Sequence, residues 1–174
     1  MAGSTSRSVL VLGGARSGKS AYAESLLSRA PLLYLATGQA HDDEMAERIR
    51  LHRERRGPHW ITLEEPLDLV DALYRHRSAF SGILVDCLTL WISNLMLAER
   101  DVFQATEALC AAITVTTVPL VLVSSEVGMG LVPETPLGRQ FRDAQGIVNQ
   151  RVARVAQGVV FVAAGLPLVL KDEK

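Results

Sequence analysis

Eight residues near the N-terminus have the types and spacing of a phosphate-binding loop. The segment Gly13-Gly14-Ala15-Arg16-Ser17-Gly18-Lys19-Ser20 fits the pattern G-x-x-x-x-G-K-[ST] at every defined position. Its glycines let backbone N–H groups turn toward phosphate oxygens, and the helix expected to follow offers its positive N-terminus. Lys19 would reach the β and γ phosphates, and the Ser20 hydroxyl would bind Mg²⁺. The segment therefore predicts a nucleoside triphosphate site.

A loop of this kind needs a carboxylate at the end of a neighbouring strand to hold Mg²⁺. Asp86 directly follows the apolar run 82–85 and is the preferred candidate. Glu126, which follows the run 120–125, is the alternative. Either carboxylate could instead cap a helix or belong to a loop.

A second concentration of chemistry lies in 41–60, where acidic residues precede basic ones in a pattern that matches the dipole of a helix over 42–56. The simplest interpretation is a solvated helix with ion pairs such as Glu44 with Arg48. His52, however, stands among arginines. That setting suits an imidazole that attacks phosphorus, because cations hold the phosphate oxygens. The remaining histidines, expected as surface or helix-capping residues, are His41, His59 and His76.

The elements that must position these residues alternate along the chain. Apolar runs predict strands at 8–12, 32–36, 60–63, 82–85, 119–123, 159–162 and 168–170. Helical patterns occupy 19–29, 42–56, 66–76, 88–97, 102–112 and 137–156. This alternation predicts an α/β fold with a mostly parallel, doubly wound sheet and helices on both faces. The last two strands are expected to close the sheet as an antiparallel hairpin through 165–167.

Size and composition bound the class of protein. The 174 residues predict one domain over 1–174, with 48% hydrophobic and 21% charged residues, as in ordinary globular proteins. The net charge of -1 disfavours a nucleic-acid binder. The first apolar run begins near Val9 and breaks at Gly13, which predicts neither a signal peptide nor a membrane span. Cys87 and Cys110 are expected to be free, buried thiols in a cytoplasmic protein.

Further motifs carry a resemblance that extends over 9–170. Beside the phosphate loop they are Ala36-Thr37-Gly38, Asp42-Asp43-Glu44-Met45, His52-Arg53 with Arg56, Pro58 and Trp60, Asp86 to Trp91 with Asn94, Glu126 to Gly130 with Val132-Pro133, Phe141-Arg142-Asp143 and Asn149-Gln150. Together they resemble the bifunctional adenosylcobinamide kinase/adenosylcobinamide-phosphate guanylyltransferases of cobalamin biosynthesis. The resemblance implies a P-loop NTPase-like, RecA-like fold and a homo-oligomer, with a trimer suggested.

The resemblance also implies two reactions. ATP or GTP phosphorylates adenosylcobinamide, and GTP then transfers GMP to adenosylcobinamide phosphate through a GMP–histidine intermediate on His52. The residues that it places near the nucleotide are Ala36, Thr37, Gly38, Arg53, Glu54, Arg55 and Arg56. Glu64 would contact the guanine or ribose, and Asp86 would serve the metal. Gly57 departs from the family pattern, in which arginine and proline are often adjacent.

Two other functions are weighed against this one. The first is a different small-molecule kinase, in which His52 merely binds phosphate. The second is a regulatory GTP-binding switch, which would read guanine through an N/T-K-x-D segment that the sequence lacks. The segment 126–133 is expected to contact the substrate or a second subunit, or to be a turn that its glycines permit.

Overall fold

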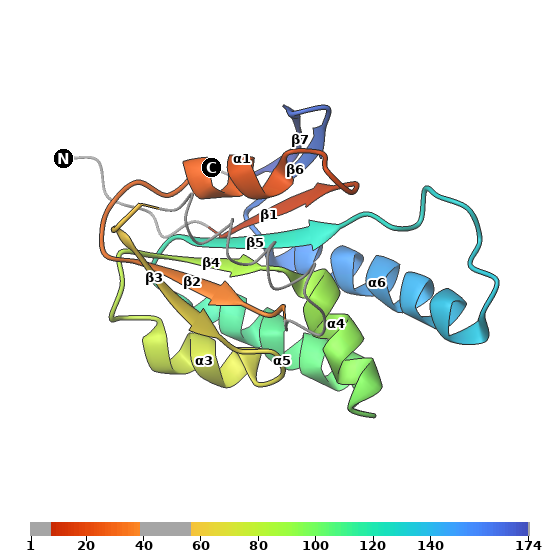
Figure 1. The fold of residues 1–174 in the computed structure, drawn as a ribbon. Coiled ribbons are helices and arrows are strands. Elements are labelled where there is room, and N and C mark those ends of the chain that lie inside the picture. The colour runs from red at the N-terminus through yellow and green to blue at the C-terminus, as the bar shows by residue number, and fades with distance from the viewer. Residues whose placement is uncertain (1–7, 39–56, 174) are drawn as a thin grey trace.

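The computed structural model describes residues 8–38 and 57–173, and these residues form a seven-stranded sheet with helices packed against it (Figure 1). The strands are β1 (Ser8–Gly13), β2 (Leu32–Ala36), β3 (Trp60–Glu64), β4 (Gly82–Asp86), β5 (Leu120–Ser125), β6 (Gly158–Ala163) and β7 (Leu166–Asp172). The helices are α1 (Lys19–Ser25), α3 (Leu69–His76), α4 (Leu88–Leu97), α5 (Val102–Val115) and α6 (Pro136–Val155).

The strand order is β3-β2-β4-β5-β1-β6-β7, and each neighbouring pair is parallel except β6 and β7. The parallel strands place their carboxyl ends at one edge of the sheet, where ligands of open α/β sheets bind. The predicted α/β fold, with its closing antiparallel pair, is confirmed.

Alternate side chains of each central strand enter two separate cores, as the period of two requires. On β5, Leu120 and Leu122 face the core formed with α3, α4, α5 and α6, whereas Val121 and Val123 face the core that contains α1 residues. Helices therefore cover both faces of the sheet, α1 on one and the other four on the opposite face (Figure 1).

Several predicted boundaries are wrong by a few residues. The first helix ends at Ser25 rather than at residue 29, and α3 begins at Leu69 rather than at residue 66. The hairpin turns at Ala164 and Gly165, which both have positive φ, so residues 166 and 167 already belong to β7. The predicted helix over 42–56 lies outside the described residues.

Two further expectations concern cysteines and membranes. Cys87 is buried, but Cys110 is only half-buried, so the expectation of a second buried thiol is wrong. Across 8–38 and 57–173, none of the helices combines the length and the apolar character that crossing a bilayer requires.

Candidate functional site at the carboxyl edge of the sheet

The predicted phosphate loop connects β1 to α1, in the strand–loop–helix context that its chemistry requires. The loop closes on itself through Ser17 N–H donating to Gly14 O at 3.3 Å, and Lys19 Nζ donates to the same carbonyl at 3.0 Å. Gly13 must lack a side chain here, because a Cβ would lie 2.5 Å from Ser17 Oγ and 2.6 Å from Val162 O. The loop therefore presents the N-terminus of α1 and the Lys19 ammonium at the edge of the sheet.

The β6–β7 hairpin braces this loop from the side. Gly165 N–H donates to Ser17 O at 2.8 Å. Gly18 has a φ of 92°, and a Cβ there would lie 3.2 Å from Gly165 Cα. Two segments nearly 150 residues apart in the chain thus meet backbone to backbone, and both use glycine at positive φ to do so.

Three predicted residues form one row across neighbouring strand ends. Ala36 of β2 lies opposite Glu64 of β3 on one side and Asp86 of β4 on the other. One strand, β5, separates Asp86 from the phosphate-loop strand β1, which corresponds to about 10 Å at the usual strand spacing. Glu64 lies four strands from β1, or roughly 19 Å by the same spacing.

Asp86 is the last residue of β4 and is half-buried. The Tyr34 hydroxyl donates to Asp86 Oδ2 at 2.8 Å, which orients the carboxylate at the edge. The peptide bond between Asp86 and Cys87 is cis. Asp86 is thus oriented by a residue of the neighbouring strand, at the edge of the sheet where the phosphate loop also lies.

Thr37 forms two hydrogen bonds with the backbone of Cys87, the residue after Asp86; we call this pair of bonds the Thr37 clasp. The Thr37 hydroxyl donates to Cys87 O at 2.6 Å and accepts from Cys87 N–H at 2.9 Å, and Thr37 is fully buried. Asn94 Nδ2 donates to Thr37 O at 2.8 Å and to Pro66 O at 3.1 Å. The Thr37 side chain is therefore committed to protein contacts that position Asp86.

Cys87 reports the electrostatics of this region. Burial, followed by the nearby Asp86 carboxylate, raises the pKa of the Cys87 thiol to about 11, and the Lys19 ammonium is among the smaller effects that lower this pKa. The cation of the phosphate loop therefore acts on the turn that follows Asp86.

Glu126, the alternative carboxylate, follows β5 directly. Its N–H donates to Gly13 O at 3.0 Å, and its Oε1 accepts from Gly128 N–H at 2.6 Å. The carboxylate thereby closes a turn of its own loop. This contact agrees with the alternative that Glu126 is a loop residue. Asp86 therefore remains the better candidate for binding a metal.

Ser20 and Asp86 fit Mg²⁺ by their donor chemistry, because a hydroxyl and a carboxylate both offer oxygen ligands. Both residues lie at the same edge of the sheet. Within the described part of the chain, no group of three or more His, Cys, Asp or Glu residues could hold a metal ion. A magnesium ion bound with a nucleotide needs only one or two protein ligands, because phosphates and waters supply the others.

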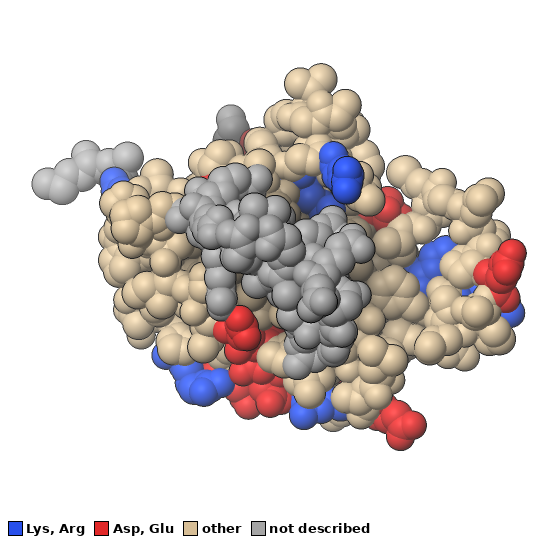
Figure 2. All heavy atoms as spheres, viewed as in Figure 1, with Lys and Arg blue, Asp and Glu red and all other residues tan. Residues whose placement is uncertain are grey.

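The predicted nucleophile and its arginines, His52, Arg53, Arg55 and Arg56, lie outside the described residues, as does Glu54. In Figure 2, Lys or Arg atoms of the described surface show between the β6–β7 hairpin at the top and the loop leading to α6 on the right. His59 is exposed, and His76 stands in the last turn of α3 with its ring against Phe80.

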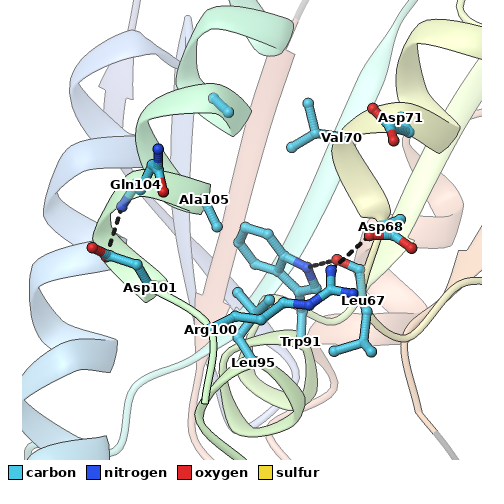
Figure 3. Close-up of a pocket in the computed structure, with 11 residues that line it drawn as sticks. Leu67, Asp68, Val70, Asp71, Trp91, Leu95, Arg100, Asp101, Gln104 and Ala105 are labelled. Atoms are coloured by element: carbon cyan, nitrogen blue, oxygen red, sulfur yellow. Dashed lines mark hydrogen bonds and ion pairs between the residues drawn. The ribbon is translucent and has the colours of Figure 1, made fainter. Parts of the chain in front are cut away.

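A separate cavity of about 480 Å³ lies among α3, α4 and α5 (Figure 3). Trp91 lines the cavity and donates from Nε1 to Leu67 O at 3.0 Å, while Arg100 pairs with Asp68 at 2.6 Å (Figure 3). Asp101 caps α5. These polar groups bond to one another, and no phosphate-loop residue lines the cavity, so we assign it to packing rather than to the chemistry.

Sequence reasoning missed three residues that shape the site. They are Tyr34, which orients Asp86, Gly165, which supports the phosphate loop, and Thr89, whose Oγ1 accepts from Ser125 N–H at 2.7 Å. Each acts across strands or between distant segments. No local spacing signals such a contact.

Comparisons of the sequence with a family model and with known proteins point to the same family. A family model described as "Cobinamide kinase / cobinamide phosphate guanyltransferase" matches residues 9–170. The chain is 45% identical to the bifunctional adenosylcobalamin biosynthesis protein CobP of Pseudomonas aeruginosa, over 94% of this chain and 97% of that protein. It is 41% identical to the bifunctional adenosylcobalamin biosynthesis protein CobU of Salmonella typhimurium, over 94% and 99% respectively.

Solved structures with a similar fold are much more distant in sequence. A KaiC-like protein of Pyrococcus horikoshii has a TM-score of 0.54 at 14% identity, covering 90% of this chain and 71% of that one. The flagellar accessory protein FlaH of Methanocaldococcus jannaschii also has a TM-score of 0.54, at 12% identity, covering 97% and 80%. These likenesses support the fold.

Proposed function

This chain belongs to the cobinamide kinase / cobinamide phosphate guanyltransferase family, and from this premise we propose that one nucleotide site at the carboxyl edge of its sheet serves both reactions. The protein is a bifunctional transferase of adenosylcobalamin biosynthesis, acting on cobinamide with nucleotide substrates. The observation that carries the proposal is the phosphate loop of Gly13 to Ser20, whose strand β1 is separated from Asp86 by the single strand β5. We propose further that 1–174 act as one domain.

In the kinase step, the terminal hydroxyl oxygen of cobinamide attacks the γ phosphorus of ATP or GTP. The bond from the γ phosphorus to the bridging oxygen breaks, the nucleoside diphosphate leaves, and the hydroxyl proton passes to solvent or a base. Lys19 and the backbone N–H groups at the start of α1 would neutralise the charge that develops on the phosphate oxygens. The contact between Lys19 Nζ and Gly14 O supports this role, because it directs the ammonium over the loop.

In the guanylyl step, we propose His52 as the nucleophile. An imidazole nitrogen attacks the α phosphorus of GTP, pyrophosphate leaves, and the imidazole N–H proton is released. A phosphate oxygen of cobinamide phosphate then attacks the same phosphorus, and the P–N bond breaks to restore the imidazole. The phosphate loop would hold the departing pyrophosphate here, whereas it holds the transferred phosphate in the kinase step. Arg53, Arg55 and Arg56 would bind phosphate oxygens beside His52.

Mg²⁺ would be held by Ser20 and Asp86, and when bound it would neutralise charge on the phosphates. The orientation of Asp86 by Tyr34 and by the Thr37 clasp supports this assignment. Ala36, Thr37 and Gly38 would then shape the floor of the site. Glu64, four strands from the phosphate loop, would contact the ribose or guanine end of the nucleotide.

The test separates the two steps with GTP labelled at the α or the γ phosphate. We expect label from the γ phosphate to appear on cobinamide, and label from the α phosphate to appear on the protein in an acid-labile, base-stable bond. His52→Ala should lose the protein-bound label and the GMP transfer but keep the kinase reaction. Lys19→Ala should slow both reactions by on the order of a hundredfold or more.

The matched control is His59→Ala, which removes an exposed histidine close in sequence to the charged segment and should leave both reactions unchanged. Absence of protein-bound label in the unmodified enzyme, with GMP transfer intact, would refute the covalent mechanism. An unreduced rate of either reaction in Lys19→Ala would refute a single site.

A further inference from the structure

The connection between β5 and α6 presents an apolar surface that neither proposed reaction step has used. We call residues 127–133 the apolar loop. Met129 is 82% exposed, Leu131 97% and Val132 62%. Single exposed apolar side chains are common, but three within four residues at the tip of one loop form a patch, and such patches mark binding sites.

Polar contacts fix the apolar loop at both ends. At its start, Gly128 N–H donates to Glu126 Oε1 at 2.6 Å. At its end, Arg139 Nη1 donates to Pro133 O at 3.0 Å and to Glu134 O at 2.7 Å. The apolar side chains are therefore displayed by an ordered frame, which lowers the entropy cost of binding a ligand there.

A buried amide network anchors that frame to the sheet. Gln145 Nε2 of α6 donates to Ser124 Oγ at 2.8 Å and to Asn149 Oδ1 at 3.0 Å, and Asn149 Nδ2 donates to Ser125 O at 3.1 Å. Ser124 and Gln145 are fully buried and Asn149 nearly so. The end of β5 and the body of α6 are thus joined by hydrogen bonds, and the apolar loop between them takes its position from both.

The same frame joins the nucleotide site. Glu126 N–H donates to Gly13 O, and Ser125 lies opposite Gly13 in the β1–β5 pairing. From this point the apolar loop arches beyond the end of the sheet before it returns into α6 (Figure 1). Figure 2 shows this segment as an uncharged lobe, with acidic atoms between it and the basic atoms below the β6–β7 hairpin. An apolar surface therefore stands next to the phosphate loop but outside it.

We propose that the apolar loop is the surface on which the corrin macrocycle of the acceptor rests during both reactions. This inference rests on the proposed function, because the acceptor is the cobinamide of the family description. The reacting hydroxyl of cobinamide ends a short flexible arm, whereas the macrocycle is broad, with methyl-bearing faces and amides at its periphery. The macrocycle is too large to enter a phosphate loop. It needs an apolar support that lies no farther from the γ phosphate than the arm carrying the hydroxyl can span.

A second copy of the chain is the competing occupant. The macrocycle is favoured because the apolar loop is continuous with the site to which the acceptor must come, through the Gly13 and Glu126 contact. A separate exposed apolar surface, on β7, is available for contacts between copies: Leu166 is 72% exposed and Leu168 60%.

The experiment replaces Met129 and Leu131 with serine, singly and together, in the full-length chain. Three quantities are measured: the KM for cobinamide in the kinase reaction, the KM for the nucleotide, and the molecular mass in solution. Loss of one buried leucine contact should raise the cobinamide KM by about tenfold, and the double variant should raise it further. The nucleotide KM should change by less than about twofold, and the molecular mass should stay the same, since neither depends on this contact.

The control is Leu97→Ser, which removes another exposed leucine, at the C-terminal end of α4. Leu131→Met should keep most of the affinity because it preserves an apolar contact. A lower mass in the serine variants would show that the apolar loop forms a subunit contact. An unchanged cobinamide KM would show that the apolar loop does not bind the acceptor. Either result overturns the inference. Failure of the unmodified protein to phosphorylate cobinamide would instead refute the proposed function.

Discussion

At the residue scale, Asp86, the carboxylate proposed to hold the metal, is positioned by neighbours that have no proposed part in the chemistry. Tyr34 holds one carboxylate oxygen of Asp86, and Thr37 occupies both backbone groups of Cys87. A charged group held in advance costs little reorganisation when phosphate charge develops, which is the usual source of electrostatic catalysis. We therefore expect the buried residues around Asp86 to contribute to the proposed reactions by restricting the position of its carboxylate.

Cys87 offers a test of this environment. Burial, followed by the nearby Asp86 charge, raises its pKa from 9.0 to about 11. An unfolded chain would begin to form thiolate near pH 9, whereas the folded protein should not do so until the pH approaches 11. We expect a thiolate-specific reagent to leave Cys87 unmodified at neutral pH in a Cys110→Ala variant, and to modify it after denaturation.

The comparison variant is Cys87→Ala, which keeps the half-buried Cys110. The pKa of Cys110 is also raised, chiefly by burial, but its partial exposure should let the reagent reach it. Rapid modification of native Cys87 at neutral pH would show that the turn after Asp86 opens readily, contrary to the rigid site described above.

At the element scale, the β6–β7 hairpin and the phosphate loop behave as one structure. We expect Gly165→Ala to lower the free energy of unfolding by about 1 kcal/mol, because its φ of 79° disfavours a side chain. The same change should weaken GTP binding, since the hydrogen bond from Gly165 to Ser17 O supports the loop. Urea unfolding and GTP titration measure the two effects.

Gly165→Asn is the matched variant, because asparagine tolerates positive φ better than alanine does. It should recover part of both losses, since a Cβ at this position meets no atom within 4 Å. If GTP affinity stayed constant while stability fell, the hairpin would support the fold alone and the coupling would be wrong.

At the scale of the whole molecule, β7 is an edge strand with apolar side chains facing solvent. The exposed fraction is 60% for Leu168, 59% for Val169 and 57% for Leu170. An edge of this kind is open to another chain unless something covers it. It supports the proposal that the protein is a homo-oligomer, for which a trimer is our expectation.

The prediction is that Leu168→Lys together with Leu170→Lys lowers the mass in solution toward the 18.9 kDa of one chain, because lysine at an edge opposes pairing. Light scattering after size-exclusion chromatography measures the mass. The control is Leu97→Lys, on the exposed end of α4. A monomeric unmodified protein, or an unchanged oligomer in the double variant, would contradict this role of β7.

The sequence by itself determined the features that local spacing encodes. The eight residues of the phosphate loop are contiguous in the sequence. They therefore predict the ligand, and they also predict the strand and the helix that flank the loop. Periodicity likewise predicted each described strand and helix to within a few residues, because burial of one or two faces repeats along the chain. The motifs also pointed to the family that the comparisons show.

Tertiary structure alone decided which separated residues meet. The strand order leaves only β5 between Asp86 and the phosphate-loop strand and places Glu64 on the edge strand β3. This order depends on long-range packing that no local pattern records. The Tyr34 hydroxyl, the Gly165 turn and the buried network of Ser124, Gln145 and Asn149 became visible for the same reason. Hydrogen bonds between distant segments depend on register and on facing direction, which exist only once the sheet has formed.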